Sequence, residues 1–402
     1  PGSVMQDLSG WAFTDGIDFI FPQGTRLAPG GFLVIAKSST RTLANHPGLD
    51  AGMVFGDFKG SLADGGERIA LSRLEGGILV VEDELTYRDS DRWHRFADGR
   101  GATLERRDPR AGSFGPSNWA DSDESAKSEW TTVEFKGTLA HGNSAAPANQ
   151  VQMFLLGPGE ALVDQVEVIP DGGSNVLANG DFESGTSGWF FQGNQRRSQL
   201  ETGEAFAGAN SLRLIASRRG DPGPNRARAP LTRTLSSGSK ATLRAKVRWL
   251  AGHPEFLMRF RGNWLEASAR LKVPSNLGTP AAANSQLVAN AGPEIEGVSH
   301  RPLLPKAGEE IRVFAGVSDS DGLDGVILQY RLDPSGTTTD APMNDDGAGA
   351  DLTAGDEIFS GVIPGQGNGG LLAFQIIAND RASASADFPP GGEALVRVGE
   401  PD

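Results

Sequence analysis

Acidic residues gather in two loops of the C-terminal third, where their spacing comes nearest to metal chemistry. The stretch SDSDGLDG carries Asp319, Asp321 and Asp324, and a second stretch, NDDGAGADLTAGDE, begins at Asn344. Carboxylate oxygens are the ligands that Ca²⁺ takes in proteins. Neither stretch has the twelve-residue EF-hand spacing, with Gly at position 6 and Glu at position 12. Asp and Gly also form ordinary turns, so the sequence leaves both interpretations open.

Residues that could catalyse a reaction are scarce. The chain has five His and no Cys, which excludes a Cys nucleophile, thiolate zinc sites and disulfides. His46 and His94 lie near acidic residues, but a general acid or base needs a positioned partner and a pocket, which spacing alone does not supply. No Gly-rich phosphate loop follows a strand, and no GxSxG motif is present. We therefore expect that the chain is not an enzyme.

The composition favours short strands joined by turns. The 402 residues include 54 Gly and 24 Pro, and no stretch shows a sustained helical period. A length of 402 suggests two or three domains. No apolar run is long enough for a membrane span. The sequence therefore predicts an all-β chain of three tandem β-sandwiches.

Charge is distributed unevenly along the chain. Residues 189–273 contain 13 Arg and 3 Lys against 5 acidic residues, whereas residues 292–402 contain 6 basic and 19 acidic residues. Blocks of opposite charge indicate separate modules with different surfaces. The basic block is interpreted either as an ordinary solvated surface or as a surface for a polyanion. Nucleic acid is not expected, because the basic residues are not interleaved with aromatic ones.

The first 125 residues alternate in the manner of strands, with Gly-containing turns between them. They resemble the lamin-tail domain, an immunoglobulin-like sandwich that acts in adhesion or targeting. The family has a further strand before LSGW, and here only PGSVMQD precedes it, so we expect an open edge or a replacement segment. The matching pieces are LSGW (8–11), FPQGTRLAPGGFLVI (21–35), FKGSLADGGERIAL (58–71), DELTYRDSDRWHRFADGRGATLERRDP (83–109) and PSNW (116–119).

The middle of the chain resembles the jelly-roll carbohydrate-binding modules of the xylanase-associated type. NVLANGDFESGTSGW (175–189) matches the opening strand of that family, and EAFAGANSLRLIAS (204–217) matches the next. The family's closing strands are missing downstream, but EWTTVEFKGT and VQMFLLGPGEALVDQVEVI match them within residues 129–170. We therefore predict one jelly roll over 129–274, in which residues 129–170 supply the closing strands. The alternative is that 129–170 is the remnant of another jelly roll.

The same resemblance implies a structural Ca²⁺. In the family the ion lies where the first and last strands meet, and the matching residues are Glu183, the carbonyl of Asp181 and Asp164, with a further oxygen expected from the loop at Asn210. Ca²⁺ prefers such hard oxygen ligands. We expect these four residues to come together.

Sugar binding by such a module needs aromatic faces that are open to solvent. Trp249 and Trp264 are the candidates, since Trp189 belongs to the core pattern. The alternative is that both fill the interior of the sandwich, where large aromatic residues are common. Exposure of the two indoles distinguishes these interpretations.

The remainder divides into a linker and a third sandwich. Residues 275–291 are small and include a proline, as linkers do. Residues 292–402 contain about seven short strands and resemble bacterial immunoglobulin or fibronectin type III-like domains, with VSDSDGLDGVILQY as the best match. Lamin-tail, jelly-roll and fibronectin-like modules in this order resemble large bacterial surface proteins that carry a kinase domain of the spore-coat-protein-H type.

That resemblance implies a non-catalytic extracellular or cell-surface segment. It would provide adhesion or polysaccharide binding through the jelly roll, alongside other domains of a longer polypeptide. The alternative is a scaffold that spaces a neighbouring catalytic domain and binds no ligand.

Overall fold

The computed structural model describes residues 3–89, 93–112, 115–140, 142, 145–220, 225–389 and 392–398. Strands dominate, and the described residues contain one short α-helix, which confirms the all-β prediction. Contacts divide the chain into two units. One unit comprises residues 95–103 and 121–278, and we call it the jelly-roll unit after the fold predicted for it from the sequence. The flanking unit comprises residues 1–94, 104–120 and 279–402.

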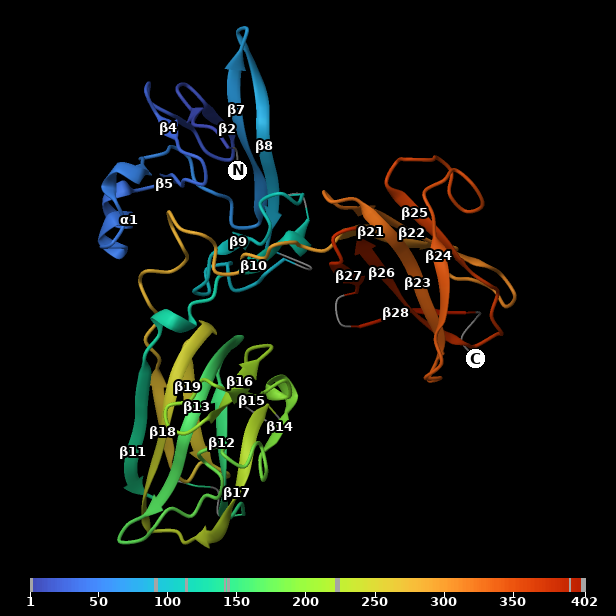
Figure 1. Ribbon diagram of the computed structural model, residues 1–402. Coiled ribbons are helices and arrows are strands. Elements are labelled where there is room, and N and C mark those ends of the chain that lie inside the picture. Colours follow the sequence, from blue (N-terminus) through green and yellow to red (C-terminus); the bar gives the residue numbers. More distant parts are fainter. Residues whose placement is uncertain are drawn as a thin grey trace. The chain divides into compact units, whose positions relative to one another are not determined.

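Two five-stranded antiparallel sheets form the jelly-roll unit (Figure 1). The first sheet has the order β11-β18-β13-β16-β15 and the second has the order β14-β17-β12-β19-β20. The first contains β11 (Trp130–Thr138), β13 (Gly159–Pro170), β15 (Gln199–Thr202), β16 (Asn210–Ala216) and β18 (Lys240–Gly252). The second contains β12 (Ala148–Leu155), β14 (Phe190–Gln192), β17 (Arg226–Leu235), β19 (Glu255–Phe260) and β20 (Glu266–Arg270). Two 3₁₀ turns accompany them, η3 (Ser125–Lys127) and η4 (Gly193–Gln195).

Strands from residues 129–170 are inserted in both sheets. β13 pairs with β16 on one side and β18 on the other, while β12 lies between β17 and β19. The strand pairing predicted from the sequence is therefore present. An independently packed remnant would have shown no ladder to the later strands, so that alternative is wrong.

One core fills the space between the two sheets. In β18 the residues Leu243, Ala245, Val247 and Trp249 are buried, and the residues that alternate with them point outward, as the sequence predicted. Strands place successive side chains on opposite faces, which accounts for the pattern. Burial of this apolar surface is the main favourable contribution to folding of the unit.

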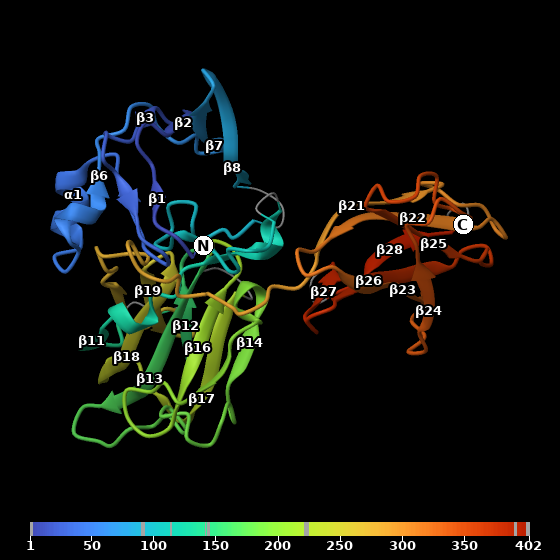
Figure 2. The same cartoon turned by 45° about the horizontal axis from the view of Figure 1, so that its top comes forward.

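The N-terminal part of the flanking unit consists of small sheets (Figure 2). A four-stranded sheet has the order β3-β2-β7-β8, so one edge of β8 has no strand partner among the described residues. The β7–β8 hairpin exposes several apolar side chains, including Ile78 and Val81. The strands are β1 (Gln6–Asp7), β2 (Ala12–Asp15), β3 (Phe19–Ile20), β4 (Arg26–Leu27), β5 (Val34–Ile35), β6 (Val54–Phe55), β7 (Gly66–Glu75), β8 (Ile78–Arg88), β9 (Leu104–Arg106) and β10 (Trp119–Asp121), with α1 (Ser39–Asn45), η1 (Ala51–Met53) and η2 (Pro116–Asn118).

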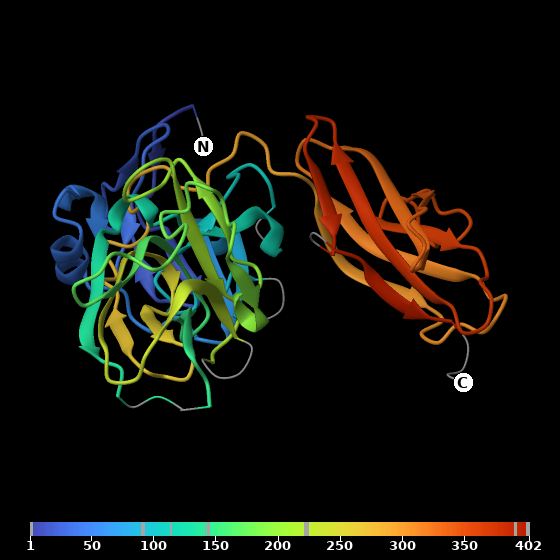
Figure 3. The same cartoon turned by 90° about the horizontal axis from the view of Figure 1, so that it is seen from below.

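The C-terminal part of the flanking unit is a sandwich of two sheets around its own core (Figure 3). One sheet has the order β21-β22-β25, and the other has the order β24-β23-β26-β27 with β28 also paired to β26. The strands are β21 (Glu294–Arg301), β22 (Ile311–Ser318), β23 (Leu323–Asp333), β24 (Thr339–Met343), β25 (Ile358–Ile363), β26 (Leu371–Asp380), β27 (Ser385–Phe388) and β28 (Ala394–Arg397).

Candidate functional site

A row of polar, charged and aromatic side chains crosses the outer face of the second jelly-roll sheet. Gln152 of β12 lies directly opposite Arg228 of β17 on one side and Arg259 of β19 on the other. The row continues to Phe190 of β14 and to Glu266 of β20. Because directly paired residues point to the same side of a sheet, these five side chains lie on one side of it. Gln152, at the centre of the row, is only 3% exposed, whereas Phe190 is exposed.

Two further arginines extend the row along the strands. Arg226 stands two residues from Arg228, and the Nε atoms of both donate to Oε1 of Gln192, at 3.2 and 2.9 Å. Arg261 follows Arg259 at the same spacing, and its backbone N–H donates to the carbonyl of Gln150. We call this surface the anion face; its arginines are Arg226, Arg228, Arg259 and Arg261.

Three of the four arginines of the anion face have no acidic partner among the described residues. Arg226, Arg228 and Arg261 form no ion pair with any described residue, whereas Nη1 of Arg259 lies 3.7 Å from Glu266. Burial lowers the pKa of Arg226, and the charges of the other three arginines lower it further. Three of these arginines are half-buried and one is exposed. Arg226 thus lies within the field of three other guanidinium groups.

Aromatic rings support two of these guanidinium groups. The Arg228 guanidinium lies 4.6 Å from the ring centroid of Phe190, and that of Arg259 lies 4.7 Å from the centroid of Phe154. Stacking of this kind orients the planar group while leaving donors at its edge. Such donors match the paired oxygens of carboxylates, sulfates and phosphates.

The outer face of the first sheet is equally rich in arginine, but its arginines are paired. We call it the paired face. Arg213 contacts Glu160 at 2.7 Å and Glu201 at 3.4 Å, Arg244 contacts Glu134 and Glu167, and Arg248 contacts Glu204. Cross-strand pairs of opposite charge are typical of sheet stabilisation. The positive charge of these three arginines is consequently neutralised, whereas Lys246 between them contacts the hydroxyl of Thr132.

The prediction that Trp249 stacks on a sugar is wrong. Its side chain is 1% exposed, and its indole N–H donates to the carbonyl of Gly252 at 3.0 Å. The alternation of β18 places it with the inward residues, so no ligand can reach its face. Trp264 is half-buried, packs against the core, and donates to the carbonyl of Ala146 at 2.7 Å. A sugar contact by Trp264 stays a prediction.

Asp164, a predicted calcium ligand, is fully buried at a bulge of β13. Its Oδ2 accepts hydrogen bonds from the backbone N–H groups of Phe206 and Ala207, at 2.9 and 3.0 Å. Its Oδ1 accepts one from Gln165 at 2.6 Å. Burial raises the pKa of Asp164, because a charged carboxylate loses its hydration there.

The same loop brings two of the other predicted ligands together. Oε1 of Glu183 accepts hydrogen bonds from the backbone N–H groups of Ala209 and Asn210, both at 2.9 Å. Asp181 is exposed, and its Oδ1 accepts a long hydrogen bond from the N–H of Glu183 at 3.4 Å. The residues 204–210 therefore connect Glu183 and Asn210 to Asp164, while Asp181 lies at the adjoining turn.

The donor set fits Ca²⁺ in chemistry. Asp164 and Glu183 form no ion pair with any described residue, and the negative charge of Glu183 further raises the pKa of Asp164. Two carboxylates that repel one another, with lone pairs to spare and carbonyls nearby, suit a hard cation. Among the described residues, however, the acidic side chains whose oxygens converge within 4.8 Å are a different trio, Asp345, Asp351 and Asp356.

That trio belongs to the second acidic loop of the C-terminal sandwich, and each member also makes a turn. Asp345 accepts hydrogen bonds from the N–H groups of Gly355 and Glu357, at 2.7 and 3.0 Å. Asp351 and Asp356 likewise accept backbone N–H groups. The geometry therefore contains both features that the sequence left open, converging carboxylates and turn-forming hydrogen bonds.

The predicted linker is bound to the N-terminal part of the flanking unit. The carboxylate of Glu105, which is 4% exposed, accepts hydrogen bonds from Oγ1 of Thr279 at 2.6 Å and from the N–H and hydroxyl of Ser285, both at 2.7 Å. The N–H of Val288 donates to the carbonyl of Arg107. Residues 279–291 thus follow a defined path.

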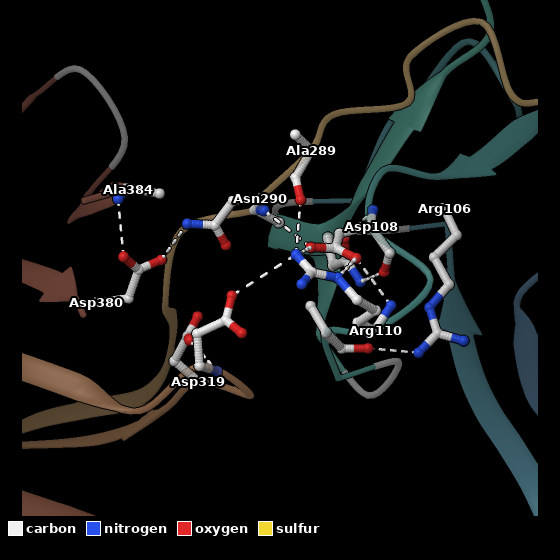
Figure 4. A network of polar contacts seen from close by, with 12 residues as sticks. Arg106, Asp108, Arg110, Ala289, Asn290, Asp319, Asp380 and Ala384 are labelled. Atoms are coloured by element: carbon white, nitrogen blue, oxygen red, sulfur yellow. Dashed lines mark hydrogen bonds and ion pairs between the residues drawn. The ribbon is translucent and has the colours of Figure 1, made fainter. Parts of the chain in front are cut away.

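A charged network continues this attachment to the C-terminal sandwich (Figure 4). The carboxylate of buried Asp108 accepts hydrogen bonds from the backbone N–H and from the guanidinium group of Arg110. The guanidinium group also donates to the carbonyl of Ala289 at 2.6 Å. Arg110 lies 3.6 Å from Asp321, and Asn290 donates to Asp380 at 2.7 Å. The network joins three segments of the flanking unit through one arginine.

The arginines of the anion face were missed as a site from the sequence. Their signal is present as two R-x-R pairs, RARAP at 226–230 and RFRG at 259–262, because alternate residues of a strand share a face. The sequence indicated a basic block, but it did not show that the two pairs meet across β12.

Comparisons with known proteins assign no family. No family model matches the sequence, and no curated protein matches it. A DUF4785 family protein from Legionella pneumophila is similar at 8% identity and a TM-score of 0.19, over 69% of this chain and 67% of that one. FdeC, an Escherichia coli adhesin, is similar at 8% identity and a TM-score of 0.19, over 83% and 74% of the two chains. Scores this low support no inference about fold or function.

Proposed function

We propose that the jelly-roll unit binds an acidic polysaccharide across the anion face, and that the chain is a non-catalytic adhesion segment of a secreted or surface protein. The observation that carries this proposal is the set of three arginines, Arg226, Arg228 and Arg261, that lack an acidic partner among the described residues. Neighbouring like charges cost free energy unless something neutralises them, and a carboxylated or sulfated polymer would do so. Among the described residues, no helix is long and apolar enough to cross a membrane.

The test compares the two outer faces in the full chain. Binding to polygalacturonate is measured by affinity electrophoresis and calorimetry, with neutral dextran as the control polymer. The triple variant Arg226→Gln/Arg228→Gln/Arg261→Gln should weaken binding by at least roughly 100-fold, or about 2.7 kcal/mol, which is the loss of one or two charge-assisted hydrogen bonds at about 1.5–3 kcal/mol each. The matched triple Arg213→Gln/Arg244→Gln/Arg248→Gln should change it by less than about threefold, because those guanidinium groups already contact carboxylates.

Two results would reject the proposal. Equal binding of dextran would show that charge is not recognised, and equal loss in both triple variants would show that only net charge matters. Single-stranded DNA serves as a third polymer, and tighter binding of DNA than of polygalacturonate would assign the face to nucleic acid instead. A loss of binding on Trp264→Ala would add the predicted stacking contact.

Structural Ca²⁺ is part of the proposal. Asp164 and Glu183 would supply carboxylate oxygens and Asp181 its carbonyl, with Asn210 alongside; the ion would neutralise two neighbouring acids and fix the loop 204–210. These residues already hold the loop through backbone hydrogen bonds. Ca²⁺ would thus stabilise the jelly roll without contacting the polysaccharide.

A scaffold that spaces other domains is the second candidate function. The observation that favours it is the attachment of residues 279–291 through buried Glu105 and Asp108, because a bound linker fixes the path between two domains. Glu105→Gln/Asp108→Asn should release this segment to limited proteolysis. If the double variant resists the protease as the wild type does, the linker is not fixed by these acids.

A further inference from the structure

A cleft of about 790 Å³ opens at one end of the jelly-roll unit. We call it the end cleft. Arg218 and Arg219, which follow β16, form one wall, and His253 of the β18–β19 turn forms another. Arg100 also lines the cleft, although it comes from the loop 95–103, which precedes the jelly roll in sequence. The cleft is therefore lined both by the sandwich and by the loop 95–103, which precedes the strands of the sandwich in sequence.

The loop 95–103 is fixed to the sandwich by close backbone packing. The N–H of Gly252 donates to the carbonyl of Arg100 at 2.8 Å. Gly101 has a positive φ of +87°, and a Cβ there would lie 2.5 Å from the Trp249 ring. Only glycine tolerates both the backbone conformation and this approach. The floor of the end cleft is therefore a defined surface.

Positive charge dominates the lining of the end cleft. No carboxylate is among its described lining residues. Glu255 lies close by and neutralises part of the charge, through His253 at 2.9 Å and Arg270 at 3.0 Å. Arg218 and Arg219 are exposed and form no ion pair with a described residue. Two adjacent guanidinium groups thus remain available to a ligand.

The backbone that carries these two arginines is anchored from beneath. The side-chain amide of Asn194 donates to the carbonyl of Arg218 at 2.7 Å, and the N–H of Ser217 donates to the carbonyl of Asn194 at 2.9 Å. Arg95 adds a hydrogen bond to the carbonyl of Ser217 at 2.9 Å. An anchored backbone lowers the entropy that a ligand must remove from the site.

We infer that the end cleft binds a single anionic sugar residue, the charged end of the polysaccharide. Guanidinium groups match the paired oxygens of a carboxylate or sulfate. A volume of about 790 Å³ exceeds what a bare oxyanion fills and lies in the range of small-molecule pockets. A sugar that bears the charged group satisfies both conditions.

The position of the end cleft relative to the anion face supports a chain end as its occupant. Arg270 lines the cleft and lies opposite Glu255 in the β19–β20 ladder. Glu255 points to the same side of the sheet as Arg259, four residues along β19, because both alternate with buried residues. The cleft thus opens at one edge of the anion face. In this respect the inference rests on the proposed function.

The test uses the full chain and two probes at fixed ionic strength, glucuronic acid and polygalacturonate, with inorganic sulfate as a third. Calorimetry should show saturable binding of glucuronic acid, and Arg218→Gln/Arg219→Gln should weaken it at least tenfold, the loss of about one charge-assisted contact. The control Arg196→Gln/Arg197→Gln removes an equal charge from an adjacent exposed pair in the same unit and should change the Kd by less than about twofold.

The two proposals fail in different ways. If glucuronic acid shows no saturable binding, or if the Arg218/Arg219 variant binds it as well as the wild type, the end cleft is rejected whatever the polymer does. If sulfate binds as tightly as glucuronic acid, the site recognises an oxyanion and the sugar is rejected. If the anion-face triple variant keeps polymer affinity while the Arg218/Arg219 variant loses it, the proposed function of the face fails and the end cleft stands.

Discussion

The two outer faces of the jelly-roll unit both carry arginines but differ in how many of them contact a carboxylate. Both carry arginines at alternate strand positions, Arg244 and Arg248 on the paired face and Arg226 and Arg228 on the anion face. On the paired face each of the arginines Arg213, Arg244 and Arg248 contacts a carboxylate. On the anion face Arg226, Arg228 and Arg261 form no ion pair with a described residue, and Arg259 lies near Glu266.

This difference distinguishes arginines whose charge is neutralised by a neighbouring carboxylate from arginines whose charge is available to a ligand. Exposed ion pairs contribute little to stability, but they neutralise the surface on which they lie. A surface on which guanidinium groups lie close to one another retains a positive electrostatic potential, and that potential attracts anions. The number of arginines on a face is therefore less informative than the register of the acids opposite them.

Truncating a side chain of the core between the two sheets should have the largest effect on stability. Trp249→Ala should lower the free energy of unfolding by about 3–5 kcal/mol, since the ring is fully buried between the sheets. Chemical denaturation followed by circular dichroism measures this change. Half-buried Trp264 provides the comparison, and a smaller loss is expected for Trp264→Ala. An equal loss for the two variants would contradict the assigned burial.

The next largest effect on stability should come from Ca²⁺ bound at Asp164, in the sheet that carries the paired face. With Ca²⁺ at about 100 times its Kd, linkage gives roughly 2.7 kcal/mol of stabilisation, and the melting temperature should rise by several degrees relative to EDTA. Asp164→Asn should abolish that rise, because the residue would supply carboxylate oxygen. Asp345→Asn, in the other acidic loop, is the matched control for the jelly-roll transition. A Ca²⁺ effect that survives Asp164→Asn but disappears in Asp345→Asn would move the site to that loop.

A single added carboxylate should convert the anion face into a paired one. Gln152 lies opposite both Arg228 and Arg259, so Gln152→Glu places an acid of the same shape between them. Affinity for polygalacturonate should fall about tenfold, which corresponds to about 1.4 kcal/mol. Gln152→Met, with similar length and no charge, is the control in calorimetry. Unchanged affinity in the Glu variant would show that the polymer binds elsewhere.

The smallest effect expected is the loss of one ion pair from the paired face. Glu160→Gln should lower the free energy of unfolding by about 0.5–1 kcal/mol, because half-buried Arg213 loses its closest acid. Arg226→Gln on the anion face should leave stability unchanged or raise it, since one member of a repelling cluster is removed. Urea denaturation of both variants measures the signs. A stability loss for Arg226→Gln larger than that for Glu160→Gln would contradict the contrast between the faces.

Much of the fold can be predicted from the sequence, because half-buried strands show an alternation of apolar and polar residues that is visible without tertiary information. The alternation Leu243, Ala245, Val247, Trp249 predicted the inward face of β18, and the displaced closing strands within 129–170 predicted both ladders. The same alternation already implied that Trp249 points inward, so its assignment to sugar binding conflicted with its own strand. Trp264 lies beside a turn, where the period gives no guidance.

The sequence by itself determined the strand content, the pairing of the strands within 129–170 with later strands, and the existence of a basic block. The tertiary structure alone decided which arginines in that block are neutralised. Arg244 and its partner Glu134 are separated by 110 residues along the chain, and Arg226 has the same local pattern but no acid opposite it. Cross-strand register sets these neighbours, and register depends on how distant strands pack around one core.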